Sequence, residues 1–197
     1  MAKPLDPYRK LANFLCELNV LKRMPRTGSF VAGIKHPDDV AEHVFRATQL
    51  GFILAELEGV SDKNRVMRMV MVHDNAEARI GDVNKVMARY FKDKRKAELK
   101  AFEEQCSNLP ETLAKEFLGL FREYEAQKTP ESRVARDADL LELAFQAKEF
   151  MDIGYQAKTL WIKNVQENLT TPSAQKLFGA MMETKVNDWW EELNGDT

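Results

Sequence analysis

The sequence contains few of the residues that most often reveal a function by themselves. Its 197 residues include 2 cysteines and 3 histidines, and 29 basic and 31 acidic side chains leave a net charge of −2. Two cysteines without Cys-x-x-Cys spacing form no thiolate zinc or redox motif. A net charge this close to zero does not indicate a nucleic-acid polymer or an anionic membrane as a partner.

The sequence also lacks long apolar runs. No stretch reaches the ~18–20 apolar residues that cross a bilayer, and the start MAKPLDPYRK has no apolar segment of the kind found in secretory signals. We therefore expect no membrane partner and a cytoplasmic location. In that reducing compartment Cys16 and Cys106 are expected to be free thiols.

Helical patterns follow one another along the chain, and no segment shows the sustained alternation of β-branched residues that is typical of strands. Asp39 and Glu42 form a capping-box pattern, and Gly59 ends the helix that follows. Residues 23–37, with two prolines and two glycines, predict a loop. The sequence thus predicts an all-α protein with a single domain over 1–197. Further helices are predicted at about 6–22, 61–80, 97–107, 110–127, 129–151 and 172–193.

Two of the three histidines lie on apolar faces of predicted helices. His43 precedes Ala47 and Leu50 on the buried side of its helix, and His73 follows Met69 on the next. A buried imidazole needs a hydrogen-bond partner or a metal ion. Either histidine taken alone is compatible with a hydrogen-bonded core residue.

Carboxylates accompany these histidines. Asp74 and Glu77 follow His73, and a helix that continues to Gly81 places His73 and Glu77 on one face. Asp139 falls on the buried side of its own helix, where a salt bridge to an arginine is the alternative. Burying several such groups without a cation costs several kcal/mol per charge. The mixed nitrogen and oxygen set suits one divalent Mn, Co, Ni, Fe or Zn ion with open positions, which points to catalysis by an activated water.

The order of these residues resembles a known family. His43 is followed 30 residues later by the His73-Asp74 pair, and Asp139 lies 65 residues beyond Asp74. The stretches RTGSFVAGIKHPDDVAEHVFR, MVHDNAEARIGDV and DADLLELAFQAKEF resemble the YfbR-like 5′-deoxynucleotidase and HD-domain-containing-protein-2 branch of the HD superfamily of phosphohydrolases. The resemblance covers about residues 10–155, and residues 172–193 form a C-terminal helical extension.

The resemblance implies a fold and a set of roles. The fold would be an orthogonal bundle of about six to eight helices, and relatives commonly form homodimers. Glu77 matches the carboxylate that orients or activates the attacking water. Asp82 matches a residue near the metal and the nucleotide sugar, with a part in catalysis and in substrate binding. Arg26 matches an arginine assigned to phosphate. The four residues that match metal ligands are His43, His73, Asp74 and Asp139.

One position departs from the family pattern. In several relatives an aromatic residue closely follows the arginine and shapes the sugar pocket. The nearest aromatic residue here is Phe30, which is out of register with that position. A wall that excludes a 2′-hydroxyl would have to come from the loop after Arg26, where Phe30 is the candidate for substrate binding.

These observations predict a metal-dependent phosphomonoesterase that converts 2′-deoxynucleoside 5′-monophosphates to deoxynucleosides and phosphate. The same chemistry on a ribonucleotide, a triphosphate or a signalling nucleotide is the nearest alternative. A di-iron oxygenase would need further histidines, and only His36 is left over. A non-catalytic helical scaffold would be expected to lack part of the ligand set, which is complete here.

Overall fold

The computed structural model describes residues 6–155 and 159–195, and these residues form helices without a named strand. The predicted all-α class is confirmed. The predicted domain over 1–197 also includes residues 1–5, 156–158 and 196–197, which lie outside the described residues. Within the described part of the chain, no helix is both long enough and apolar enough to cross a membrane.

The helices differ widely in length. In chain order they are α1 (Pro7–Leu18), the 3-10 helix η1 (Asn19–Arg23), α2 (Thr27–Val31), α3 (Val40–Glu58), α4 (Lys63–Val72), α5 (Glu77–Ile80), α6 (Lys85–Ala88), α7 (Lys94–Cys106), α8 (Glu111–Ala126), α9 (Pro130–Asp152), α10 (Thr159–Asn168), α11 (Pro172–Glu183) and α12 (Asp188–Asn194). The expected count of six to eight is slightly low, because α2, α5 and α6 are helices of only 5, 4 and 4 residues.

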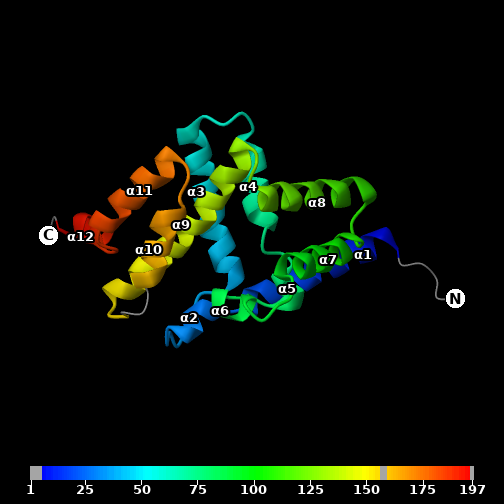
Figure 1. The fold of residues 1–197 in the computed structure, drawn as a ribbon, viewed down its shortest axis with the longest axis horizontal. Coiled ribbons are helices and arrows are strands. Elements are labelled where there is room, and N and C mark those ends of the chain that lie inside the picture. The colour runs from blue at the N-terminus through cyan, green and yellow to red at the C-terminus, as the bar shows by residue number, and fades with distance from the viewer. Residues whose placement is uncertain (1–5, 156–158, 196–197) are drawn as a thin grey trace.

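The centre of the molecule is built from α3, α4 and α9, which pack against one another (Figure 1). Helices α1, α7 and α8 lie on one side of this centre, and α10, α11 and α12 lie on the other (Figure 1). The apolar faces of the three central helices form the main core, which includes Leu54, Val66, Met69 and Leu141. Burial of these faces is the main favourable contribution to folding.

Several helix ends follow the sequence signals. Asp39 and Glu42 form a reciprocal capping box at the start of α3, and Gly59 ends that helix with a φ of 63°, a conformation that favours glycine. Thr129 caps α9, whose first residue is Pro130. These caps fix the positions at which the two longest helices begin, and both helices carry candidate site residues.

Three segments differ from the prediction. The helix expected over 61–80 ends at Val72, a turn follows at 73–76, and α5 then begins at Glu77. The loop predicted over 23–37 contains the short helix α2. The last predicted helix, over 172–193, is divided into α11 and α12. In the first case, i→i−3 hydrogen bonds tighten the chain after α4, so His73 and Glu77 do not share the face of one continuous helix.

Candidate functional site

Four side chains from the centre of the fold point their polar atoms at one another. His43 Nε2, from α3, lies 3.3 Å from Asp139 Oδ1 and 3.7 Å from Asp74 Oδ2. His73 Nε2, at the end of α4, lies 3.3 Å from Asp74 Oδ2 and 3.7 Å from Asp139 Oδ1. The structure therefore brings together all four residues that were predicted as metal ligands.

Both imidazoles are oriented by their other nitrogen. His43 Nδ1 faces the carboxylate of Glu142, and His73 Nδ1 lies 2.6 Å from the carbonyl oxygen of Val70, to which it is placed to donate. A proton on each Nδ1 leaves a lone pair on each Nε2. Among the described residues neither buried Nε2 has a hydrogen-bond partner. Each lone pair therefore points into the cluster without accepting a hydrogen bond.

Asp139 is held in the same way. Its Oδ2 accepts hydrogen bonds from Tyr124 Oη and from Arg136 Nη1, each at 2.7 Å. Burial raises the pKa of Asp139, but Arg136 and the two histidines lower it well below its usual range. Asp139 therefore stays ionised, with Oδ1 left to face the imidazoles.

The cluster fits a divalent cation. Burial and Arg26 lower the pKa of His43, but Glu142 and Asp139 raise it by more than that. The resulting pKa of His43 is about 9. The carboxylates thus favour a positive charge between the imidazoles, and a cation supplies that charge while both rings stay neutral. The candidate ligand atoms of His43, His73 and Asp139 lie within 4.8 Å of one another. Two nitrogens and two oxygens suit a first-row transition metal with open positions.

Arg26 and Asp82 border this cluster. Arg26 Nη1 lies 3.2 Å from Asp74 Oδ2 and 3.6 Å from Asp82 Oδ1. The other oxygen of Asp82 accepts hydrogen bonds from the backbone N–H and the hydroxyl of Thr27. Asp82 is 8% exposed, so it is a buried link between the end of α5 and the segment that carries Arg26.

Glu77 is the first residue of α5 and lies near the same carboxylates. It is buried, and its Oε2 has no hydrogen-bond partner among the described residues. Burial, together with Asp74 and Asp82, raises the pKa of Glu77 well above its usual value. A carboxylate with a raised pKa is a stronger base than an ordinary glutamate, which suits it to accept a proton.

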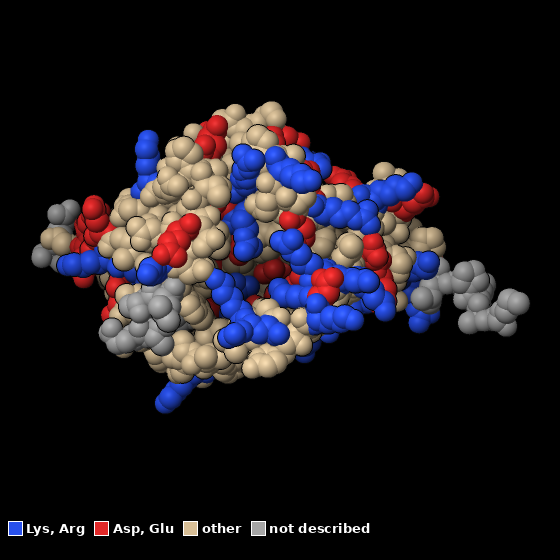
Figure 2. Space-filling model, in the orientation of Figure 1, with Lys and Arg blue, Asp and Glu red and all other residues tan. Residues whose placement is uncertain are grey.

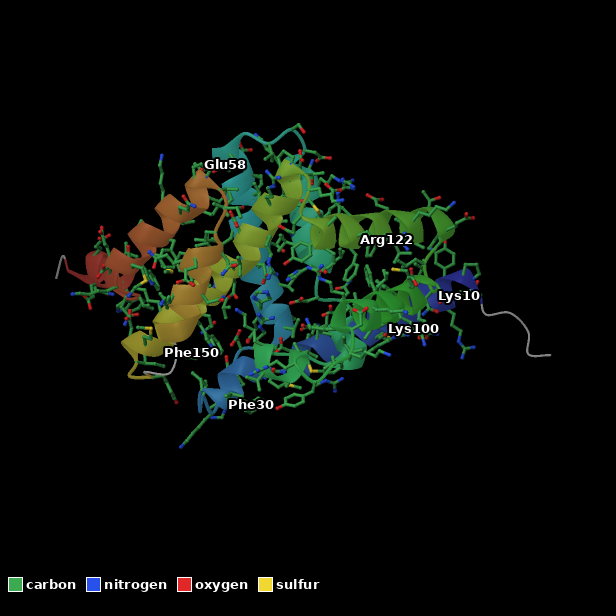
Figure 3. The ribbon with its side chains drawn as sticks, viewed as in Figure 1. Lys10, Phe30, Glu58, Lys100, Arg122 and Phe150 are labelled. Carbon is green, nitrogen blue, oxygen red and sulfur yellow. The ribbon has the colours of Figure 1, made fainter. Side chains whose placement is uncertain are left out.

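Phe30 is not brought into this group. It lies on α2 at the outer edge of the molecule (Figure 3), and 54% of it is exposed. The charged segment KDKRK at 92–96 approaches the site through Lys94. Lys94, the first residue of α7, pairs with Glu98, and its charge acts on Glu77 and Asp74.

The partners that orient the histidines and Asp139 were not singled out in the sequence. Glu142 and Arg136 each lie three residues from Asp139 on α9, and that spacing places all three near one face of the helix. Tyr124 comes from α8 and no local pattern links it to Asp139.

Lys and Arg side chains surround a hollow that has acidic atoms at its floor, over the region where α3 and α9 meet (Figure 2).

The fold and the site define an all-helical protein with a buried His/Asp cluster suited to one divalent cation. The chain matches the family model described as HD domain over residues 18–180, and it belongs to that family. It is 31% identical over 148 residues to the human (Homo sapiens) protein named 5′-deoxynucleotidase HDDC2. The match covers 75% of this chain and 72% of the human protein.

Solved structures share the fold. A conserved hypothetical protein from Pyrococcus furiosus has a TM-score of 0.75 and 23% identity, and the match covers 88% of this chain and 99% of that one. A structure titled predicted metal-dependent phosphohydrolase, from Magnetospirillum magnetotacticum MS-1, has a TM-score of 0.69 and 23% identity, over 90% of this chain and 91% of that one. At these identities the two structures establish the arrangement of helices alone.

Proposed function

We propose that the protein is a metal-dependent phosphohydrolase that converts 2′-deoxynucleoside 5′-monophosphates to deoxynucleosides and phosphate. The observation that carries this function is the convergence of two carboxylates and two buried Nε2 atoms that have no hydrogen-bond partner in the described part of the chain, in a protein of the HD-domain family. The name of the human relative, a 5′-deoxynucleotidase, supports the choice of substrate.

The proposed ligands are His43, His73, Asp74 and Asp139, holding one divalent Co, Mn, Ni, Fe or Zn ion. When bound, this ion would polarise a phosphoryl oxygen and make a water molecule more acidic. The imidazole nitrogens favour these ions over Ca and Mg, which prefer oxygen ligands. The identity of the ion is to be tested by elemental analysis of the purified protein.

Arg26 is proposed to bind the substrate phosphate. Its guanidinium already faces the cluster through Nη1, and its planar array of donors matches two phosphate oxygens. Asp82 positions this arginine by holding the backbone of the next residue, Thr27. Asp82 Oδ1, which faces Arg26, is the proposed acceptor for a sugar hydroxyl.

Glu77 is proposed to act on the attacking water. The water oxygen forms a bond to phosphorus, its proton passes to the Glu77 carboxylate, and the bond from phosphorus to the sugar O5′ breaks. The departing O5′ takes up a proton from solvent to give the free nucleoside, and Glu77 then releases the water proton to solvent, which restores its carboxylate. The buried position of Glu77 and its raised pKa suit this transfer.

A panel of substrates tests the function. Metal-loaded protein is incubated with every deoxy- and ribonucleoside 5′-monophosphate, and free phosphate is measured. We expect release from the deoxynucleotides, with a preference of at least about tenfold over the ribonucleotides, because an added hydroxyl in a filled pocket is rejected by about 10–100-fold. Equal kcat/KM for dAMP and AMP would indicate a general 5′-nucleotidase, and release only from triphosphates or cyclic nucleotides would contradict the proposal.

The role proposed for Phe30 is to exclude the 2′-hydroxyl of a ribonucleotide. Its 54% exposure leaves it outside an enclosed pocket. Phe30→Ala in the same panel measures any contribution, and an increase in AMP hydrolysis relative to dAMP would support it.

We further propose that the protein forms a homodimer through the outer face of α3. This face exposes Phe45, Phe52, Ile53 and Leu57, and Phe45 lines a cavity of about 360 Å³ that also includes Leu18, Leu21 and Met71. Such a face is self-complementary in a two-fold dimer. A Phe45→Glu, Phe52→Glu double variant would be monomeric by light scattering if the face is the interface, and dimeric if it is not.

The proposed substrate is a mononucleotide, and we propose neither a nucleic-acid polymer nor a membrane as partner. We propose a cytoplasmic location, because both cysteines, the exposed Cys16 and the buried Cys106, are free as is usual in a reducing compartment. Cell fractionation with an antibody to the full chain tests this location.

A further inference from the structure

A tryptophan that is distant in sequence, Trp161, lies against the segment that carries Arg26. A Cβ atom placed on Gly28 would be 2.7 Å from both Cη2 and Cζ2 of Trp161. This is closer than Cβ contacts ordinarily come, so the six-membered ring of Trp161 rests directly on the Gly28 backbone. Gly28 is two residues from Arg26 and adjoins Thr27, which is bound by Asp82.

The position of Trp161 is fixed by its own helix. Trp161 lies on α10 and is partly buried, while Ile162 and Val165 of that helix are in the core. The Lys85 ammonium group at the start of α6 donates a hydrogen bond to Asn164 Oδ1. Helix α10 is thereby attached both to the centre of the fold and to the segment that follows Asp82.

The location of Arg26 indicates which part of a nucleotide would meet this ring. Arg26 Nη1 lies 3.2 Å from Asp74 Oδ2, at the edge of the cluster, so a phosphate bound by Arg26 lies between it and the candidate metal site. The sugar and base must then extend away from the cluster. The chain also leaves the cluster in going from Arg26 into α2, and Trp161 is the aromatic side chain packed on that helix at Gly28.

We propose that Trp161 forms the aromatic wall of the nucleoside pocket and stacks on the base of the substrate. This inference rests on the proposed function, because it assumes a nucleoside 5′-monophosphate with its phosphate at Arg26. An aromatic ring stacks on any of the bases, since each has a π face, and it need not form hydrogen bonds with them. Trp161 therefore contributes to affinity for the nucleoside and leaves the chemistry at phosphorus to other residues.

Steady-state kinetics with two substrates test the proposal. dAMP carries a base, and 2-deoxyribose 5-phosphate presents the same phosphate and sugar without one. We expect Trp161→Ala to raise KM for dAMP by about tenfold or more, the scale of one base–aromatic stack, with kcat little changed. KM for 2-deoxyribose 5-phosphate should stay at its unmodified value. Trp161→Phe should restore most of the affinity for dAMP, because it keeps an aromatic face.

The matched control is Trp189→Ala. Trp189 is 61% exposed and lies on α12, so its removal should change neither constant. A loss in Trp161→Ala that is equal for both substrates, or that falls on kcat, would overturn the proposal and assign Trp161 to the packing of α2. If unmodified protein releases phosphate from other esters and not from dAMP, the proposed function fails first and the inference with it.

A binding measurement tests base stacking on Trp161 without turnover. It also keeps the proposal testable if Trp161→Ala does not fold, because it uses Trp161→Phe. The chain has 3 tryptophans, and stacking of a base on Trp161 would quench its fluorescence. dAMP should quench the unmodified protein, 2-deoxyribose 5-phosphate should not, and Trp161→Phe should lose the dAMP signal. Quenching by dAMP that persists in Trp161→Phe, or is absent from the unmodified protein, would overturn the proposal.

Discussion

Each imidazole of the cluster has one nitrogen fixed by the protein and one directed at the other ligands. His73 Nδ1 faces the carbonyl of Val70 at 2.6 Å, and its Nε2 has no partner among the described residues. We expect purified protein to contain close to one divalent transition metal per chain, and His73→Ala to lose most of it. His36→Ala is the control, because His36 is exposed in the segment before α3. Full occupancy by elemental analysis in His73→Ala would refute the assignment of the ligands.

Glu77 is close to the cluster without being one of the four convergent groups. A residue that acts on the water and not on the ion can be changed without loss of the ion. Glu77→Gln should therefore keep its metal and lose about 10²–10⁴-fold in kcat, the usual contribution of a general base. Asp74→Ala, measured beside it, should lose both. If Glu77→Gln loses metal as readily as Asp74→Ala, Glu77 is a ligand.

The role of Arg26 in catalysis can be tested separately from metal binding. Removal of its guanidinium should cost about 2–4 kcal/mol of transition-state stabilisation, as for other charge-stabilising donors. We expect kcat/KM of Arg26→Ala to fall accordingly while the metal content stays constant. Arg23→Ala is the matched control, since Arg23 is an exposed arginine at the end of η1. Activity of Arg26→Ala close to that of the unmodified protein would remove Arg26 from the site.

At the scale of the helices, α8 matters to the site although it contributes no candidate ligand. Its residue Tyr124 donates a hydrogen bond to Asp139 Oδ2, and burial raises the pKa of the Tyr124 hydroxyl well above its usual value, so it remains a donor. Tyr124→Phe should lower metal affinity by about tenfold or more, as is usual for residues that hold a ligand. The readout is metal competition with a coloured chelator.

Tyr90→Phe provides the comparison for that measurement, since Tyr90 is 86% exposed. It should bind metal as the unmodified protein does. Equal affinities of Tyr124→Phe and Tyr90→Phe would mean that Arg136 alone is sufficient to hold Asp139.

The sequence allowed the central helices to be predicted better than the segments between them. Asp39, Gly59 and Thr129 act through local backbone hydrogen bonds or a local backbone conformation, so their effects can be read from a few neighbouring residues. Likewise His43 and Asp139 could be singled out because each is a polar residue within an apolar helical face.

The turn after α4 could not be predicted, because a contact distant in sequence accompanies it. The apolar pattern continues through this segment, yet the carbonyl of Asn75 accepts a hydrogen bond from Gln105 Nε2 at 3.0 Å, from α7. Helix α2 has a similar cause, since Thr27 is bound by Asp82, 55 residues later. Trp161 packs on Gly28 from α10, which was not among the predicted helices.

For the whole molecule, the cluster joins parts of the chain that are far apart in sequence. His43 lies on α3, His73 and Asp74 follow α4, and Asp139 lies on α9. These are the helices that pack together at the centre of the fold. An ion held by all of them binds the folded chain and not the unfolded chain, so its binding free energy adds to the free energy of unfolding.

Removal of the ion should therefore lower the thermal stability of the entire domain. At a free metal concentration about 100 times the Kd, binding adds about 2.7 kcal/mol to the free energy of unfolding. For a chain of this length each kcal/mol corresponds to about 2–4 °C, so a chelator should lower Tm by about 5–10 °C. The measurement is a thermal melt with and without chelator, followed by restoration of the metal. His73→Ala should melt at the same temperature in both conditions, because it has no intact site from which the chelator can remove an ion. A Tm of the unmodified, metal-loaded protein that does not respond to chelator would show that the cluster is stable without a cation, with its carboxylates balanced by protonated imidazoles instead.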